Sequence, residues 1–412
     1  MKVLLINAEH ALLGGAHTVY LSMSDMLTNA GHKVIFFAMH CSNELPCAQS
    51  PYFAKTNSRK NVLRYVKNSF YNSNAANCLQ KLIDDEHPDI AHVHLMWGSL
   101  SPSILVVLKE NNIPIIHTVH DYAMICSRVT LKSKDGAVCE KCSGGHYCQS
   151  IKTRCYNGSL LKSIVATTEF SQRNKRHHPV SLIDHFNFVS QFCCDKHKEM
   201  DGRFKCAQTS VIYNVPSEDV VNLSKGGLRY TYESYYLYYG RLSYEKGLDT
   251  LITSFLDKPH LKLKIIGTGP LEERLKARCD GHADNIEFLG FKKGVELYEL
   301  VKNAKFVCVP SEWYENCPMT IIEGFTLAVP VIGARIGGIP ELVAEGENGF
   351  LFDSGSLDSL NEAITKSESL LEADYMRMKN NALNTSRSRF NRDKYVDNLL
   401  EVYQKTIKEY KK

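Results

Sequence analysis

The stretch 306–352, FVCVPSEWYENCPMTIIEGFTLAVPVIGARIGGIPELVAEGENGFLF, constrains the fold more than any other part of the sequence. Its first residues, Phe306–Pro310, form an apolar run that ends in proline, which predicts a buried strand. After a loop comes the apolar segment Met319–Leu327, which has the length of a helix, and Pro318 suits the first turn of that helix. The order strand, loop, helix is typical of a parallel α/β fold.

Two glutamates stand in this stretch, Glu315 in the predicted loop and Glu323 in the predicted helix. A carboxylate at Glu323, among apolar neighbours, is costly to bury unless it has a hydrogen-bonding partner, and sugar hydroxyls would supply one. The free amides at the helix start, with the positive end of the helix dipole, favour an anion. The alternative is a solvated helix face. The residues between the glutamates that we expect to line the site are Asn316, Cys317, Pro318, Met319 and Thr320.

Glu315 and Glu323, followed by AVPVIGARIGGIPELV and GENGFLF, resemble the donor-binding signature of the family-4 retaining glycosyltransferases. The resemblance implies the GT-B fold, in which two Rossmann-like parallel-sheet domains face each other across a cleft. It also implies that the first glutamate contacts the transferred sugar, that the second holds the ribose, and that the amides between them bind the diphosphate. It covers 235–352 most closely and extends to 1–125 and 186–216.

A second unit of the same kind starts at the predicted strand Tyr235–Tyr239. Gly240 and Arg241 follow it, and Lys246 stands just before the predicted helix Leu248–Leu256. An arginine fork and a mobile lysine charge suit a diphosphate at a helix N-terminus. Two basic residues in a loop are otherwise ordinary solvated surface residues. The segment from Gly240 to Gly247, however, resembles the phosphate-binding element of the family.

Glycines at the ends of further predicted strands allow the backbone to pass close to a nucleotide. Gly267 and Gly269 follow the strand Leu261–Ile266, and Phe291 ends the strand Asn285–Phe291, where the family places backbone contacts to the base. These positions complete the predicted nucleotide-binding set of the C-terminal half.

The N-terminal half also alternates strands and helices. Lys2–Asn7 is a predicted strand, Glu9–His17 a loop with Gly14 and Gly15, and Thr18–Asn29 a helix. The glycine pair is either a plain turn or, as the resemblance implies, a loop that faces the donor.

Two further predicted strands, Pro88–His94 and Ile113–His120, flank the helical stretch Ser103–Glu110. Ligands of parallel sheets lie beyond the strand C-termini, where His94 and the pair His120–Asp121 fall. The resemblance places His120 at the reacting face of the donor, whereas His94 fits a hydrogen-bonded core residue.

The length of 412 residues allows two domains. We expect an N-terminal acceptor domain at 1–215, with Phe186–Ser190 as its last strand, and a donor domain at 216–390. We expect residues 391–412 to form a helix that packs back on the first domain. Residues 217–233 resemble a linker.

The net charge of +4 gives no argument for a nucleic-acid partner. No apolar run reaches the roughly 20 residues that a membrane-spanning helix requires. We therefore expect a cytoplasmic protein with free or metal-bound thiols, because its 14 cysteines come without an export signal.

Five cysteines are concentrated after His120–Asp121, in a predicted insertion at 122–158. Cys139 and Cys142 have the spacing of a zinc knuckle, and two of three further cysteines would complete a structural zinc site. The candidate ligands are Cys126, Cys139, Cys142, Cys148 and Cys155, with His146 in addition. Buried free cysteines are the alternative.

Two basic segments raise the possibility of contact with an anionic membrane. In Tyr52–Ser73, Lys60, Arg64 and Lys67 would share one face of a helix, and Arg173–His178 forms a second cluster that we expect in a solvated loop. A helix that packs its apolar side on its own domain is the alternative.

The sequence thus predicts a hexosyltransferase that moves a sugar from a nucleotide-diphosphate sugar, with UDP expected over GDP, to a sugar or lipid-linked saccharide acceptor. Polysaccharide, O-antigen or exopolysaccharide assembly at the inner face of the membrane is the expected setting. Catalysis needs no metal, because Arg241, Lys246 and helix amides would take up the charge of the leaving diphosphate. The alternatives are a nucleotide-sugar 2-epimerase and a non-catalytic nucleotide-sugar-binding subunit.

Overall fold

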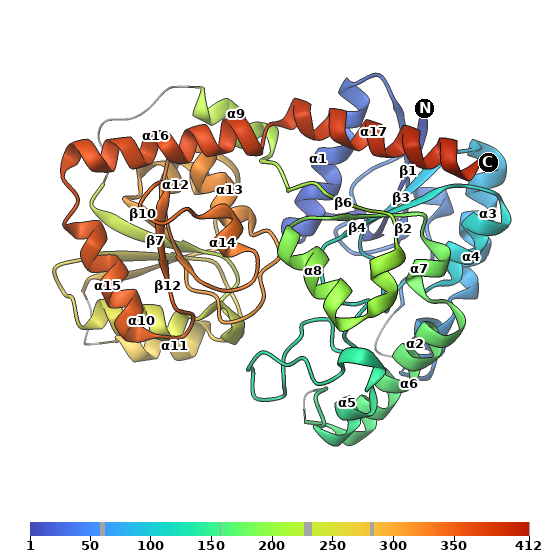
Figure 1. Ribbon diagram of the computed structural model, residues 1–412, viewed down its shortest axis with the longest axis horizontal. Coiled ribbons are helices and arrows are strands. Elements are labelled where there is room, and N and C mark those ends of the chain that lie inside the picture. The colour runs from blue at the N-terminus through green and yellow to red at the C-terminus, as the bar shows by residue number, and fades with distance from the viewer. Residues whose placement is uncertain (58–61, 157, 226–232, 281–283, 412) are drawn as a thin grey trace. The chain divides into compact units, whose positions relative to one another are not determined.

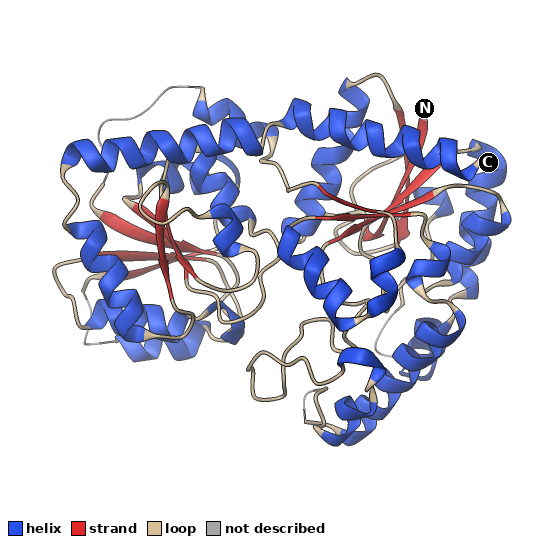
Figure 2. Cartoon of the chain, viewed as in Figure 1, coloured by secondary structure: helices blue, strands red, loops and turns tan. Residues whose placement is uncertain are grey.

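The computed structural model describes residues 1–57, 62–156, 158–225, 233–280 and 284–411. The chain divides into two compact units. The first comprises Met1–Asp135, Cys139–Ile212 and Arg392–Lys412, and the second comprises Gly136–Val138 and Tyr213–Asn391. Each unit is built on one six-stranded parallel sheet with helices against its faces (Figure 2).

The sheet of the first unit has the strand order β2-β1-β3-β4-β5-β6. Its strands are β1 (Lys2–Glu9), β2 (Lys33–Met39), β3 (Ile90–Val93), β4 (Ile115–Val119), β5 (His185–Phe188) and β6 (Thr209–Val211). The central strands β3 and β4 are buried throughout, as expected for a sheet covered on both faces.

The helices of the first unit connect these strands as crossovers or cover the sheet (Figure 1). They are α1 (Gly15–Asn29), α2 (Val62–Phe70), α3 (Ser73–Glu86), α4 (Ser103–Glu110), α5 (Cys148–Lys152), α6 (Leu160–Arg176), α7 (Pro179–Leu182), α8 (Gln191–Met200) and α17 (Arg392–Tyr410).

The sheet of the second unit has the strand order β12-β11-β10-β7-β8-β9. Its strands are β7 (Tyr235–Tyr239), β8 (Lys262–Ile266), β9 (Ile286–Gly290), β10 (Phe306–Val309), β11 (Val331–Ala334) and β12 (Gly349–Phe352). All five residues of β7, YYLYY, are buried, and the rings of Tyr236 and Tyr238 belong to the hydrophobic core of the unit.

The helices of the second unit are α9 (Glu218–Ser224), α10 (Leu248–Leu256), α11 (Glu272–Cys279), α12 (Gly294–Asn303), α13 (Met319–Thr326), α14 (Ile339–Leu342), α15 (Leu357–Glu368) and α16 (Glu372–Arg389). The predicted helices 248–256 and 319–327 are confirmed to within one residue.

Three sequence predictions about the chain path are wrong. The last strand of the first sheet is β6 and not 186–190, because Ser190 leaves the sheet and caps α8, where its Oγ accepts the N–H of Cys193 at 3.1 Å. Residues 218–224 of the expected linker form α9. Helix α1 begins at Gly15, so the glycine pair ends the loop rather than standing inside it.

The two basic segments also differ from expectation. Arg173 lies in α6 and is only 6% exposed, because its guanidinium stacks on Trp97 at 4.4 Å and donates to the carbonyl of Ala123 at 2.9 Å. The expected solvated loop is therefore wrong. Helix α2 is shorter than the predicted segment, and Lys60 lies outside the described residues.

The C-terminal helix α17 belongs to the first unit, as the sequence predicts. It packs on α1 and β4 through buried Tyr395, Leu399 and Tyr403. The Oη of Tyr403 lies 2.6 Å from Nδ1 of buried His92 in β3, so a polar contact fixes the helix on the sheet.

Among the helices that the structure describes, none combines the length and the apolar character that a membrane crossing requires.

Candidate active site

The sheet of the second unit has a switch point between β7 and β10. From β7 the chain continues to β8 and β9 on one side, and from β10 it continues to β11 and β12 on the other. Ligands of open parallel sheets bind at such a point, beyond the carboxyl ends of the strands. The loops that leave β7 and β10 here carry Arg241, Lys246 and Glu315.

Lys246 and Glu315, 69 residues apart in the sequence, form an ion pair at this switch point, with 2.6 Å between Nζ and Oε1. The hydroxyl of Ser311 donates to the same carboxylate oxygen at 2.8 Å, and the lysine lies 5.2 Å from the centre of the Trp313 ring. The residue Glu315 is 7% exposed, whereas the lysine side chain is 24% exposed. The pair is thus fixed on its acidic side and open on its basic side.

Opposing effects act on the Glu315 carboxyl. Burial would raise its pKa, but the charge and hydrogen bond of Lys246, with the Ser311 hydroxyl, lower the pKa overall. Glu315 is therefore ionised near neutral pH. An ammonium group has three N–H donors, so Lys246 can bind Glu315 and still donate to a phosphate oxygen.

Two glycines allow the backbone around this pair to come together. Gly247 has φ +66°, and a Cβ there would lie 1.9 Å from the carbonyl oxygen of Pro310. Gly337 has φ +61°, and a Cβ there would lie 2.3 Å from the carbonyl oxygen of Glu315, which accepts the N–H of Gly338 at 2.7 Å. A larger residue at either position would have a strained φ and would clash with the neighbouring backbone, so the two loops require glycine there.

Glu323 lies in α13 and is 8% exposed. The Oη of Tyr239, at the end of β7, lies 3.2 Å from Oε2, and the Oη of Tyr298 in α12 lies 3.5 Å from Oε1. Burial raises the pKa of Glu323 to about 7, against the lowering effect of the two tyrosine hydroxyls. The hydrogen-bonding partners that the sequence analysis expected from sugar hydroxyls are thus supplied by two tyrosine hydroxyls of the chain itself.

The segment between the glutamates turns into α13 as expected, but Pro318 is the N-cap rather than a residue of the first turn. Asn316 and Cys317 are buried, and the Cys317 carbonyl accepts the side-chain N–H of Asn214 at 3.2 Å. Met319 and Thr320, which begin the helix, are partly exposed.

Arg241 is exposed in the loop after β7, two residues beyond Tyr239, and its carbonyl accepts the hydroxyl of Tyr238 at 2.8 Å. This loop packs closely on the loop after β8. A Cβ at Gly267 would lie 1.9 Å from the carbonyl oxygen of Gly240, and one at Gly269 would lie 2.3 Å from that of Leu242. These glycines are required for loop packing, whatever their role toward a nucleotide.

Phe291 directly follows β9, and its side chain is 68% exposed. An exposed aromatic ring at a strand end is available for stacking on a nucleotide base. The role of Phe291 in the nucleotide site stays a prediction.

In the first unit, His120 follows β4, and its Nε2 lies 2.9 Å from Nδ1 of His94, with the two rings stacked. Burial, and then the neighbouring imidazoles of His117 and His17, lower the pKa of His120 to about 3. The ring is therefore neutral at physiological pH. Burial raises the pKa of Asp121 to about 6, although the backbone N–H of Ala123 and the charge of Arg173 act in the opposite direction.

Gly14 is the N-cap of α1, and both Gly14 and Gly15 are exposed after the short loop that follows β1. In the first sheet the switch point lies between β1 and β3, so this loop and His94 stand at its edge.

Of the five candidate metal ligands, Cys126, Cys139, Cys142 and Cys155 line one small cavity, whereas Cys148 is exposed and does not line it. Within the described ranges, no group of three or more His, Cys, Asp or Glu side chains is arranged as a metal site.

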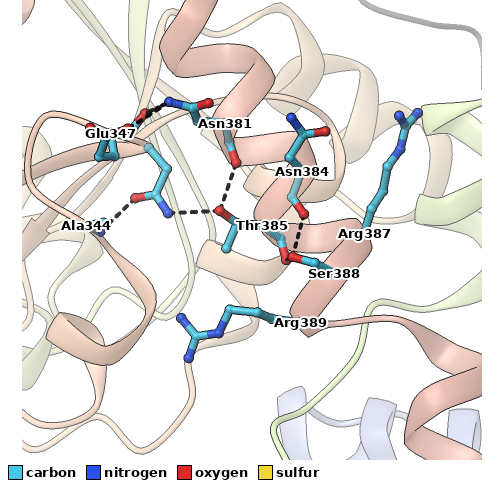
Figure 3. A pocket seen from close by; sticks show the side chains of 9 residues that line it. Ala344, Glu347, Asn381, Asn384, Thr385, Arg387, Ser388 and Arg389 are labelled. Atoms are coloured by element: carbon cyan, nitrogen blue, oxygen red, sulfur yellow. Dashed lines mark hydrogen bonds between the residues drawn. The ribbon is translucent and has the colours of Figure 1, made fainter.

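A polar hollow of about 570 Å³ lies elsewhere in the second unit, along α16 (Figure 3). None of the predicted site residues lines it. Its side chains bind one another, as when Asn381 Nδ2 donates to Glu347 Oε2 at 3.0 Å and Asn348 Nδ2 to Thr385 Oγ1 at 3.3 Å. We therefore assign the hollow no part in the site.

Comparison with known proteins identifies the family. Residues 13–215 match the family described as "Glycosyltransferase Family 4", and residues 222–385 match "Glycosyl transferases group 1". The chain belongs to the family-4 glycosyltransferases. Its fold is the GT-B fold predicted from the sequence.

Among the curated relatives of this glycosyltransferase is a protein of the cps region of Klebsiella pneumoniae, 24% identical over 87% of this chain and 92% of that protein. Sulfoquinovosyl transferase SQD2 of Arabidopsis thaliana is 33% identical, but the match covers 33% of this chain and only 26% of the plant protein.

Solved structures of the same fold include Anabaena HepE in complex with UDP and glucose, with a TM-score of 0.66, 17% identity, and coverage of 98% of this chain and 100% of that chain. Sucrose-phosphate synthase of Thermosynechococcus elongatus has a TM-score of 0.68 and 17% identity, and the match covers 98% of both chains.

Sequence reasoning missed several side chains of the candidate site. Tyr239 is the last residue of β7 and Ser311 is the second residue after β10, so their places at the carboxyl ends of these strands were open to prediction. Tyr298 gave no such signal, because it lies in the middle of an ordinary amphipathic helix and meets Glu323 only through the fold.

Proposed function

We propose that this glycosyltransferase moves a glycosyl group from a nucleotide-diphosphate sugar to an acceptor hydroxyl and retains the anomeric configuration. The observation that carries the proposal is the Lys246–Glu315 ion pair at the switch point between β7 and β10. A cation held by a buried carboxylate, with free donors on its open side, suits a diphosphate.

In this proposal Arg241, Lys246 and the first amides of α13 take up the negative charge that grows on the leaving diphosphate. Such preorganised charge supplies much of the rate enhancement in enzymes and requires no metal ion here. Glu315 orients the donor sugar, and Glu323 accepts the ribose hydroxyls. The pKa of Glu323, about 7, lies close to physiological pH, so both protonation states are populated there. Ribose hydroxyls that donate to the carboxylate would favour its ionised form.

The role of His120 toward the reacting sugar belongs to the same proposal. Its supporting observation is the neutral ring, fixed by His94, beyond the end of β4. A neutral imidazole can accept or donate a hydrogen bond to a sugar hydroxyl.

The nucleotide base of the donor and the biosynthetic context are inferred from similar proteins. HepE was solved with UDP and with UDP-glucose, which favours a UDP-sugar donor over a GDP-sugar. The relative from a cps region favours an acceptor in surface-polysaccharide assembly. A cytoplasmic reaction follows from the nucleotide-sugar donor.

Contact with an anionic membrane is a further part of the proposal. Leu63 in α2 is 85% exposed and Leu161 in α6 is 72% exposed, and the two helices pack on each other. Arg64, Lys67 and Lys162 are exposed beside them. Exposed leucines among basic residues suit an anionic lipid surface. Sedimentation with anionic and with neutral vesicles tests this contact, which would be excluded if neither retained the protein.

The decisive experiment incubates the enzyme with UDP-, GDP- and ADP-sugars, with and without saccharide acceptors, and follows released nucleotide and the product anomer by NMR. We expect transfer only with an acceptor and an unchanged anomeric configuration. An isomerised donor without acceptor would instead indicate a 2-epimerase. Nucleotide binding without any turnover would indicate a non-catalytic subunit.

A further inference from the structure

The insertion after β4 contains four cysteines at symmetrical spacing. Twelve residues separate Cys126 from Cys139, two separate Cys139 from Cys142, and twelve separate Cys142 from Cys155. Structural zinc sites use four thiolates or a mixture of thiolates and imidazoles, and the two-residue gap is the usual spacing of one ligand pair.

The fold brings these four cysteines together. All four line a cavity of about 20 Å³, which also has Leu131 in its wall. A volume of this size accommodates a single small ion or one water molecule, and it is too small for an iron–sulfur cluster.

The other candidate ligands are placed differently. Cys148 is exposed and lies outside the cavity wall. His146 is also exposed, and its Nδ1 lies 2.8 Å from the carbonyl oxygen of Ser143, which favours a proton on that nitrogen. The structure thus reduces the sequence prediction of five cysteines to one set of four.

Two of the four sulfur atoms have hydrogen-bonding neighbours. Backbone N–H groups of Arg128 and Leu131 donate to the thiol of Cys126, and the Oγ of Ser150 lies 2.8 Å from Sγ of Cys155.

Two lysines balance the charge of such a site. Lys132 and Lys141 line the same cavity. Zinc with four thiolates has an excess of two negative charges, and cationic neighbours reduce the cost of burying it.

The segment also needs a stabilising link. Between β4 and α6 the described chain contains only the short turn Ser143–Gly145 and the five-residue helix α5. A segment with so little regular structure is commonly stabilised by a metal or a disulfide, yet all fourteen cysteines are free thiols.

We propose that Cys126, Cys139, Cys142 and Cys155 bind one structural Zn²⁺ ion that fixes the insertion after β4. No three His, Cys, Asp or Glu side chains in the described part of the chain already stand at metal-binding distances. The thiols therefore close on the ion by side-chain rotation, and four protons leave as the four Zn–S bonds form.

The test measures metal in the full chain, expressed without a histidine tag and purified under reducing conditions. Inductively coupled plasma mass spectrometry should find one zinc per chain. Cys142→Ser and Cys155→Ser should lose it, while the matched variant Cys148→Ser should keep it. Replacement by Co²⁺ should give the absorption bands of tetrahedral thiolate coordination.

A variant that fails to fold does not end the test, because the wild-type protein gives a second measurement. Titration with a mercurial reagent should release one zinc as four thiols react. Metal-free protein, iron in place of zinc, a disulfide among the four cysteines, or equal zinc loss in Cys148→Ser would each overturn the proposal. Catalytic activity does not enter this readout, so the result is independent of the proposed transferase mechanism.

Discussion

At the scale of single residues, the site depends on charges that the fold holds in a fixed environment. Lys246 keeps Glu315 ionised in a buried position, and tyrosine hydroxyls surround a second carboxyl whose pKa lies near 7. The two glutamates therefore differ in protonation near neutral pH although both are buried. Their neighbours account for the difference.

We predict that Lys246→Ala reduces turnover by about 100-fold or more, because the variant loses one preorganised positive charge and leaves Glu315 buried without its partner. Steady-state rates with a saturating donor measure the effect. Lys262→Ala, at an exposed position at the start of β8, is the matched control and should keep near-normal rates. Equal rates in both variants would exclude the proposed phosphate contact.

Glu323 should make stability depend on pH. Its pKa in the folded protein, about 7, exceeds the ordinary value of 4.5, so the folded state binds more protons than the unfolded state between these values. Its contribution to stability is present below pH 4.5 and is lost as the pH rises towards 7, in total roughly 3 kcal/mol.

We therefore predict that Glu323→Gln weakens the loss of thermal stability between pH 5 and pH 8. The exposed Glu287→Gln, in β9 of the same sheet, is the control and should leave the pH profile unchanged. Identical pH profiles for the Glu323 variant and the wild type would contradict the account.

At the scale of elements, close backbone contacts hold the loops of the second sheet. We predict that Gly337→Ala lowers the midpoint of thermal unfolding by several degrees and also lowers activity, because the new Cβ displaces the Glu315 backbone. Gly346→Ala is the matched control: its φ of +75° is just as strained, but nothing lies within 4 Å of the added Cβ. If both variants lose activity to the same extent, the contact with Glu315 has no specific role.

Helix α17 gives a second prediction at this scale. Tyr403→Phe removes one of the two hydrogen-bond partners of buried His92, the other being Thr118, and should cost about 1–3 kcal/mol of unfolding free energy. Urea unfolding of this variant and of the control Tyr410→Phe, whose ring is near the chain end and partly exposed, measures the difference. A Tyr403 variant as stable as the wild type would mean that the buried hydrogen bond contributes little.

Many of the helices and strands could be predicted from the sequence. Strands with continuous apolar runs, such as β4, and helices with clear starts, such as α10, were found within a few residues. The three-residue strand β6 was missed, because so short a segment has no measurable period. Arg173 was misplaced, because a basic cluster gives no sign that an aromatic ring elsewhere in the chain will cover one of its members.

At the scale of the whole molecule, family membership and the two parallel sheets agree with the sequence, and the candidate site was predicted in outline. Lys246 and Glu315 were both named from the sequence, but their direct pairing was not, because it depends on the two loops meeting at one switch point. The partners of Glu323 could not be read from the sequence for the same reason.

The central claim is that the second unit binds a nucleoside diphosphate through the loops after β7 and β10. Calorimetric titration of the wild-type protein and of Arg241→Ala/Lys246→Ala with UDP, GDP and ADP tests it most directly. We predict that one of the three binds the wild type and that the double variant binds it at least about 10-fold more weakly, as expected for the loss of charged hydrogen bonds. Binding of equal strength in both proteins, or no binding of any of the three to the wild type, would contradict the claim.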